Sequence, residues 1–194
     1  MNVIKIAECN QQIAWEILKA TNIIPLWESI GAKVNIIGSL KSGLLMKSKD
    51  IDMHIYTENL DITESFSVLQ KFAQNSSVKQ IQYINLIDTE EECIEWHVLL
   101  ENKDMGNWKF DMIHIRKGSK YDGTVERVTD AIIKKLTPDI RKIILQIKYD
   151  IPNGILIPGI EIYHAVFTGG VKNYEELQQW RKTNPLVNSL GWLP

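Results

Sequence analysis

Two aspartates and a Gly-Ser pair are the residues in this sequence whose types and spacing suggest chemistry. Asp50 and Asp52 lie two positions apart in the β-rich run DIDMHIY, so both side chains project from one face of a strand. Two adjacent carboxylates repel each other, and a divalent cation relieves that repulsion. Because Mg²⁺ prefers one or two carboxylates together with phosphate oxygens, the pair predicts a site for Mg²⁺ or Mn²⁺ and a phosphate-bearing ligand.

The Gly-Ser pair has the properties of a phosphate-binding turn. Gly38 and Ser39 directly follow the short apolar run KVNII. Glycine lets the backbone come close to a ligand, and Ser39 offers a hydroxyl and a backbone N–H at an expected helix start. The same loop contains three lysines that either offset triphosphate charge or are simply solvated: Lys41, Lys47 and Lys49.

The elements that must position these residues follow from the hydrophobic pattern. Helical spacing predicts a helix over residues 10–31, broken at Pro25, and another over 63–75, capped by Thr63. Runs rich in β-formers predict strands at 33–37, 50–56, 78–87, 94–101 and 108–115. The turn NKDMGN links the last two of these strands, and we interpret the last three as an antiparallel meander. Further helices are expected at 124–136, from the cap Thr137 to about residue 149, at 160–167 and at 173–182.

These elements predict an α+β fold, in which a mixed sheet with an antiparallel meander is flanked by helices. We expect residues 1–117 to form the core together with an N-terminal helix, and residues 118–194 to form a helical C-terminal region. The chain has 194 residues, of which 44% are apolar and 24% charged, a composition typical of a soluble globular protein.

Net charge and cysteine content indicate which binding partners and which cellular compartment to expect. The formal net charge of −2 gives no overall basic excess, so a nucleic-acid partner is not expected. Cys9 and Cys93 form no CxxC pair, which favours a reduced, cytoplasmic setting. No apolar run approaches the roughly 20 residues that span a bilayer, so no membrane association is expected.

The stretch VNIIGSLKSGLLMKSKDIDMHIY resembles the nucleotidyltransferase superfamily related to DNA polymerase β. That group includes the aminoglycoside and lincosamide nucleotidyltransferases and the small bacterial MNT proteins. The resemblance covers roughly residues 33–115 and implies a third carboxylate on a neighbouring strand, for which Asp111 in KFDMI is the candidate. Small members often carry an arginine two or three residues after Gly-Ser. Here Lys41 and Ser42 stand there, so that phosphate contact would fall to Lys41.

The resemblance implies transfer of a nucleoside monophosphate from an NTP, ATP in the first instance, to a hydroxyl acceptor. Asp50, Asp52 and Asp111 would then hold two divalent metal ions, Asp111 would also accept the acceptor's proton, and Gly38, Ser39, Lys41 and Lys49 would bind the nucleotide. The acceptor stays open between a small molecule, a protein and an RNA end. The alternative is a fold relative without turnover that binds a nucleotide or a partner protein.

Several other polar residues have a functional and a structural interpretation. His54 shares a face with the aspartate pair and either contacts the ligand or is a polar edge residue. His97 and His114 alternate with apolar neighbours, which favours structural roles, and Glu95 is a second candidate for the general base. Substrate contacts or ordinary helix packing are open for four residues near the C-terminus: Tyr163, His164, Lys172 and Tyr174.

Overall fold

A five-stranded mixed sheet forms the centre of the computed structural model, which describes residues 2–184 and 192–194. The strands are β1 (Lys33–Ile36), β2 (Asp50–Thr57), β3 (Val78–Leu86), β4 (Cys93–Asn102) and β5 (Gly106–Arg116). Their order in the sheet is β1-β2-β5-β4-β3. β3, β4 and β5 pair antiparallel, as does β1 with β2, whereas β2 and β5 run parallel. The α+β fold and the antiparallel meander predicted from the sequence are therefore confirmed.

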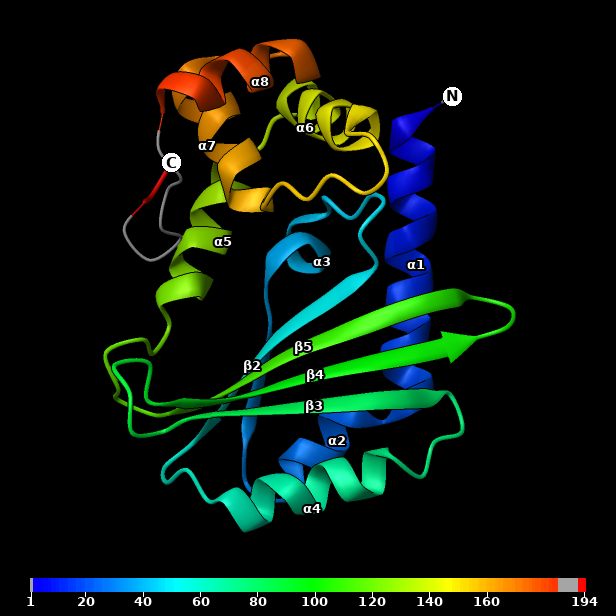
Figure 1. Ribbon diagram of the computed structural model, residues 1–194, viewed down its shortest axis with the longest axis vertical. Helices are drawn as coiled ribbons and strands as arrows, with labels where there is room; N and C mark the ends of the chain where they lie inside the picture. The colour runs from blue at the N-terminus through cyan, green and yellow to red at the C-terminus, as the bar shows by residue number, and fades with distance from the viewer. Residues whose placement is uncertain (1, 185–191) are drawn as a thin grey trace.

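Helices cover the sheet in two groups (Figure 1). α2 (Ile23–Glu28) and α4 (Ile62–Phe72) lie on one face of the sheet. On the other side are the short α3 (Gly38–Ser42) and the helices of the C-terminal third, which are α5 (Thr124–Lys135), α6 (Pro138–Asp150), α7 (Gly159–Gly169) and α8 (Tyr174–Thr183). The long α1 (Val3–Thr21) runs past the sheet toward α6. No helix within the described residues is long and apolar enough to span a membrane.

Local signals set most helix boundaries, and several of them differ from the expectation. The first helix begins at Val3 instead of at about residue 10, because the side chain of Asn2 caps it. The first helix ends at Thr21, and the next residue, Asn22, adopts a left-handed conformation. The break therefore precedes Pro25, which lies inside α2. Asp61 caps α4 by accepting from the N–H of Glu64, so the predicted cap Thr63 lies one residue inside the helix. Thr137 caps α6 as expected.

Side chains alternate between a core face and a polar face along the central strands. On the core face, the ring of Phe110 packs edge-on against Phe72 of α4, and the indole N–H of Trp27 points to the sulfur of Met112. Asp111 lies between these two β5 residues and projects from the opposite face. Because one face of β5 must be buried, its register is fixed, and Asp111 is thereby placed on the opposite face.

A second apolar cluster forms beneath the C-terminal helices. Ile144 of α6 and Ile162 of α7 belong to it, and so do Val3 and Ala7 from the start of α1. Ala14 and Ile17 from the same helix belong to the sheet core instead. α1 therefore connects both clusters. The division at residue 117 stays a prediction, and residues 185–191 of the predicted C-terminal region lie outside the described residues.

The core face should carry the stability of the sheet. Phe110 is fully buried, so Phe110→Ala should lower the free energy of unfolding by about 3–5 kcal/mol. The matched control is Phe66→Ala on α4, because 44% of Phe66 is exposed and its truncation should cost less. Urea denaturation monitored by tryptophan fluorescence measures both. Equal losses in the two variants would contradict this assignment of the core.

Candidate active site

Parallel pairing of β2 with β5 brings the three predicted aspartates to one face of the sheet. Asp52 lies directly opposite Asp111, and Asp50 lies opposite Lys109. Lys109 places its ammonium 2.8 Å from Oδ1 of Asp111. Among the described residues, however, no three His, Cys, Asp or Glu side chains are gathered closely enough to hold a metal ion. The acids share a face and a register, and Asp111 is engaged by a lysine.

The carboxylates influence each other's protonation. Burial raises the pKa of Asp52 to about 7, and the negative charges of Asp50 and Asp111 add to that rise. Burial and the charge of Asp111 also raise the pKa of Asp50. The nearby ammonium groups of Lys148 and Lys109 act in the opposite direction on both acids. The aspartates therefore occupy a common electrostatic field in which the fully ionised state is unfavourable.

Gly38 occupies a position that only glycine fits. Its backbone is in the left-handed region, with φ of +64°, and a Cβ there would overlap the carboxylate of Asp52. The backbone N–H of Ile37 donates to the carbonyl of Asp52, which ties the two segments together. Ser39 follows in the first turn of α3. The Gly-Ser element and the aspartate pair are thus in direct contact.

The cation nearest to Ser39 comes from the C-terminal third of the chain. Lys148 of α6 donates to Oγ of Ser39 at 2.9 Å, to the carbonyl of Leu44 at 2.9 Å and to the hydroxyl of Tyr163 at 2.9 Å. The hydroxyls of Ser39 and Tyr163 are 3.0 Å apart. Sequence reasoning missed Lys148, because nothing in its local pattern distinguishes it from other lysines on an amphipathic helix.

A cavity of about 700 Å³ opens beside these residues. Asp50, Asp52, Ser39 and Lys148 line its polar part. The remaining wall is mostly aliphatic and comes from the loop before β2, from α7 and from the segment between α6 and α7. It includes Leu45, Met46, Ile155, Leu156, Ile157 and Ile162. The cavity therefore joins charged groups at one end to an apolar surface that could cover part of a ligand.

Among the described residues, none of the three lysines of the Gly-Ser loop bonds to the aspartates or to Ser39. Lys41 is exposed on α3, and the ammonium of Lys49 lies 5.6 Å from the ring centre of Trp108. Lys47 lines the cavity, but its ammonium donates to the carbonyl of Ile151 at 2.7 Å. Phosphate binding by Lys41 and Lys49 stays a prediction.

His97 lies beside the acids rather than in the core. It is opposite Asp111 in the pairing of β4 with β5, and its Nδ1 is hydrogen-bonded to Oδ1 of Asp111. The predicted turn was not enough to find this contact. The structure pairs Asn102 with Gly106, and counting equally outward from that pair reaches His97 and Asp111. The structural interpretation of His97 made from apolar alternation alone overlooked this register.

The other two strand histidines have structural partners. His54 bonds through Nδ1 to Tyr56 and to Glu126 of α5, which joins the sheet to the C-terminal helices. His114 is buried on the core face beside Thr57 and Ser65, and burial lowers its pKa to about 4. Both rings are therefore held by side chains outside the aspartate cluster.

Comparisons with known proteins identify the fold. No model of a known protein family matches this sequence, and no curated protein matches it. The non-canonical poly(A) polymerase complex GLD-2–GLD-3 aligns over 97% of this chain and 67% of that chain, with a TM-score of 0.57 and 11% identity. A structure of the RNA terminal uridylyl transferase Cid1 aligns over 80% of this chain and 46% of that chain, with a TM-score of 0.55 and 13% identity.

A further Cid1 structure, of the poly(U) polymerase bound to MgATP, aligns over 72% of this chain with a TM-score of 0.54 and 14% identity. This chain spans less than half the length of the Cid1 chains that it matches. The chain thus shares the fold of these poly(A) and poly(U) polymerase structures.

The contact between Gly38 and Asp52 can be tested against a glycine without such a neighbour. Gly31 also has a positive φ, of +78°, but a Cβ there would meet nothing within 4 Å. Gly31→Ala should cost about 1–2 kcal/mol of unfolding free energy from backbone strain alone. Gly38→Ala should cost clearly more, because the carboxylate of Asp52 must also move. Chemical denaturation measures the loss of unfolding free energy in both variants. Equal losses would contradict a close contact between Gly38 and the carboxylate of Asp52.

The pKa of Asp52 predicts how stability depends on pH without metal. Since folding raises this pKa from 3.8 to about 7, the stabilisation by Asp52 is complete below pH 3.8 and disappears as pH rises through 7. Asp52→Asn cannot ionise, so its stability relative to wild type should increase between pH 4 and pH 8. Urea unfolding in EDTA measures this difference. The exposed control Asp104→Asn should show no such trend, and a flat difference for Asp52→Asn would contradict the raised pKa of Asp52.

Proposed function

We propose that this chain is a nucleotidyltransferase that moves a nucleoside monophosphate from an NTP to a hydroxyl acceptor with the help of divalent metal ions. The observation that supports this most is the shared face of Asp50, Asp52 and Asp111 on parallel strands, next to a cavity that contains Ser39 and Lys148. The nucleotidyltransferase fold of the chain supports the same class of reaction.

The donor groups suit Mg²⁺ or Mn²⁺. Carboxylate oxygens are the protein ligands that these hard cations prefer. Burial raises the pKa values of Asp50 and Asp52, and the charges of neighbouring aspartates add a repulsion that a bound cation would relieve. Asp50 and Asp52 would hold the metal, and Asp111, whose Oδ1 is paired with Lys109, would join them through its other oxygen. When bound, the metal would supply positive charge to the phosphate oxygens of the NTP.

The remaining roles belong to side chains already in place. Lys148 would bind the triphosphate, because its ammonium is fixed beside Ser39 at the polar end of the cavity. A phosphate oxygen would compete there with the hydroxyls of Ser39 and Tyr163. The aliphatic wall would cover part of the substrate and exclude water. Asp111 would accept the proton of the attacking hydroxyl, since it lies on the same face as the aspartate pair.

The nucleotide and the acceptor are the least determined parts of this function. ATP is the first donor to test, and the MgATP complex of the Cid1 poly(U) polymerase supports Mg²⁺–NTP as the ligand form. The poly(A) and poly(U) polymerases among the similar structures make an RNA end one acceptor to test beside small hydroxyl compounds and proteins.

The contacts of Asp111 favour one second candidate, a protein that binds a nucleotide without transferring it. Asp111 is paired with Lys109, and the three aspartates are not gathered into a metal-binding group within the described part of the chain. If this arrangement persists when a nucleotide binds, the chain would bind the NTP without turnover. The two candidates differ in transfer and agree in nucleotide binding.

Calorimetry with each of the four NTPs, in Mg²⁺ and in Mn²⁺, tests nucleotide binding in wild type and two variants. Asp52→Asn should abolish metal-dependent NTP binding because it removes a proposed metal ligand. Lys148→Met should weaken binding roughly ten- to a hundredfold, the effect of one lost charge-assisted hydrogen bond. Lys142→Met, an exposed change on the same helix, is the matched control and should bind as wild type does.

Labelled NTP and a panel of RNA ends, small hydroxyl compounds and proteins then test transfer. Binding with label transferred to any acceptor supports the enzyme, whereas binding without transfer favours the second candidate. Wild type that binds no NTP with either metal would overturn both. If Asp52→Asn binds Mg²⁺–NTP as tightly as wild type, Asp52 is not a metal ligand and the site is wrong.

A further inference from the structure

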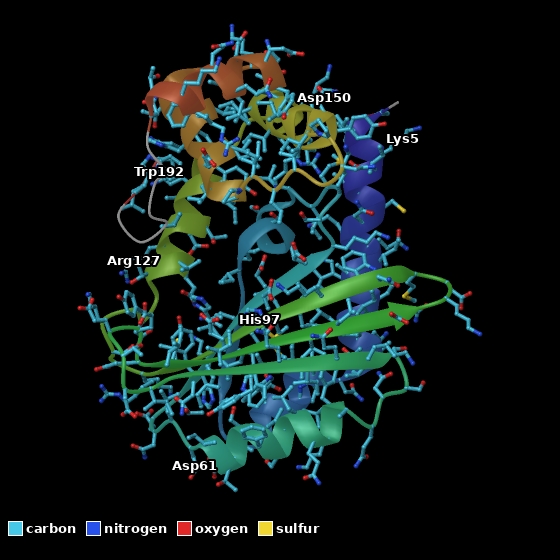
Figure 2. All side chains as sticks on the ribbon, viewed as in Figure 1. Lys5, Asp61, His97, Arg127, Asp150 and Trp192 are labelled. Carbon is cyan, nitrogen blue, oxygen red and sulfur yellow. The ribbon has the colours of Figure 1, made fainter. Side chains whose placement is uncertain are left out.

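Three polar side chains form a continuous line across β4 and β5 on the face that carries the acids. Glu95 and His97 are two residues apart on β4, and His97 is opposite Asp111 on β5. Nδ1 of His97 bonds to Asp111, and Nε2 lies 3.2 Å from Oε2 of Glu95. Both ring nitrogens are therefore engaged by carboxylates, which fixes the orientation of the imidazole. Figure 2 shows His97 in the middle part of the sheet.

Burial does not explain why these three side chains bond to one another. The side chains of Glu95, His97 and Asp111 are 27%, 21% and 22% exposed, so water can reach all three. The core-facing neighbours of His97 on β4 are Trp96 and Val98, which pack on the opposite side of the sheet. The ring of His97 is therefore not held in place by the core, and its defined contacts are the two carboxylates.

The contacts leave one oxygen of Asp111 available. Nδ1 of His97 and Nζ of Lys109 both bond to Oδ1, and within residues 2–184 and 192–194 every hydrogen bond and ion pair of this carboxylate ends on that atom. Oδ2 is the oxygen that remains for a metal or an acceptor hydroxyl. An aspartate has a broad preference in its last torsion angle, so an outside contact is needed to hold one orientation.

We propose that His97, oriented by Glu95, is a positioning residue that holds Oδ1 of Asp111 and thereby keeps Oδ2 available in the active site. This inference rests on the proposed function, because it assigns Asp111 a part in metal binding and transfer. A residue that holds a metal ligand through a second hydrogen bond commonly contributes roughly ten- to a hundredfold to metal affinity.

Lys109 does not replace His97 in this role. Its ammonium reaches the same oxygen, but its side chain is 45% exposed and extends on a flexible stem. The imidazole has fewer rotatable bonds, and Glu95 fixes its second nitrogen. In addition, a metal that approaches Asp111 would repel the ammonium of Lys109. His97 is thus the contact expected to persist when the site is occupied.

Four single variants of the full chain separate positioning from folding. His97→Ala removes the contact, and His97→Gln retains an N–H donor that can reach Asp111. Glu95→Gln weakens the fixation of the ring. The matched control is Gln82→Ala, because Gln82 is exposed on β3 and pairs with His97 in register without contacting Asp111. Thermal unfolding of all four verifies that each variant is folded.

The main readout is the affinity for Mn²⁺ in the presence of a non-transferable NTP analogue, measured by electron paramagnetic resonance, with single-turnover transfer alongside. We expect His97→Ala to lose about tenfold or more in Mn²⁺ affinity, a typical effect of removing such a support. His97→Gln should recover most of that loss, Glu95→Gln should fall between the two, and Gln82→Ala should match wild type. In His97→Ala the rate of transfer should fall, whereas the affinity for the NTP analogue measured without metal should not change.

Two results would overturn the inference in distinguishable ways. If wild type binds Mn²⁺ and His97→Ala binds it equally well, His97 does not position Asp111, and the proposed function is unaffected. If wild type itself binds no Mn²⁺ with the analogue, Asp111 is not part of a metal site, and the inference falls together with the proposed function. A loss in His97→Ala that His97→Gln does not recover would also count against positioning.

Discussion

The parallel pairing of β2 with β5 is the constraint on which the rest of this structure depends. It places Asp52 beside Asp111 and keeps Asp50 on the same face, so negative charges gather where the sheet is partly buried. Burial and mutual repulsion then make full ionisation unfavourable, as the raised pKa of Asp52 shows. Such an arrangement costs stability in the isolated chain, a cost that is common where residues are placed for function rather than for packing.

The surroundings of the acids offset this cost in part. Lys109 pairs with Asp111 from the same strand, and Lys148 reaches the polar end of the cavity from α6. The two lysines arrive from different parts of the fold, so the site is complete only when the C-terminal helices pack beside the sheet. The His54, Tyr56 and Glu126 contacts, which join β2 to α5, contribute to that packing.

Local sequence signals were sufficient for the sheet and for the aspartate pair. The i, i+2 spacing of Asp50 and Asp52 fixes their common face, and the NKDMGN turn fixes the meander. The boundaries at Asn22 and Asp61 were missed, because the break was predicted at Pro25 and the cap at Thr63. Lys148 could not be found from sequence, since its place beside Ser39 depends on how α6 packs. The contact of His97 follows from the register only when the structure shows that Asn102 pairs with Gly106.

The central claim is that Asp50 and Asp52 hold a divalent cation together with a nucleotide. Crystals of the chain grown with Mn²⁺ and a non-transferable ATP analogue would test it directly through the anomalous scattering of manganese. An anomalous peak within bonding distance of both carboxylates, with the phosphates toward Lys148, is the predicted result. A bound analogue with no peak at these carboxylates, or with manganese bound elsewhere, would contradict it.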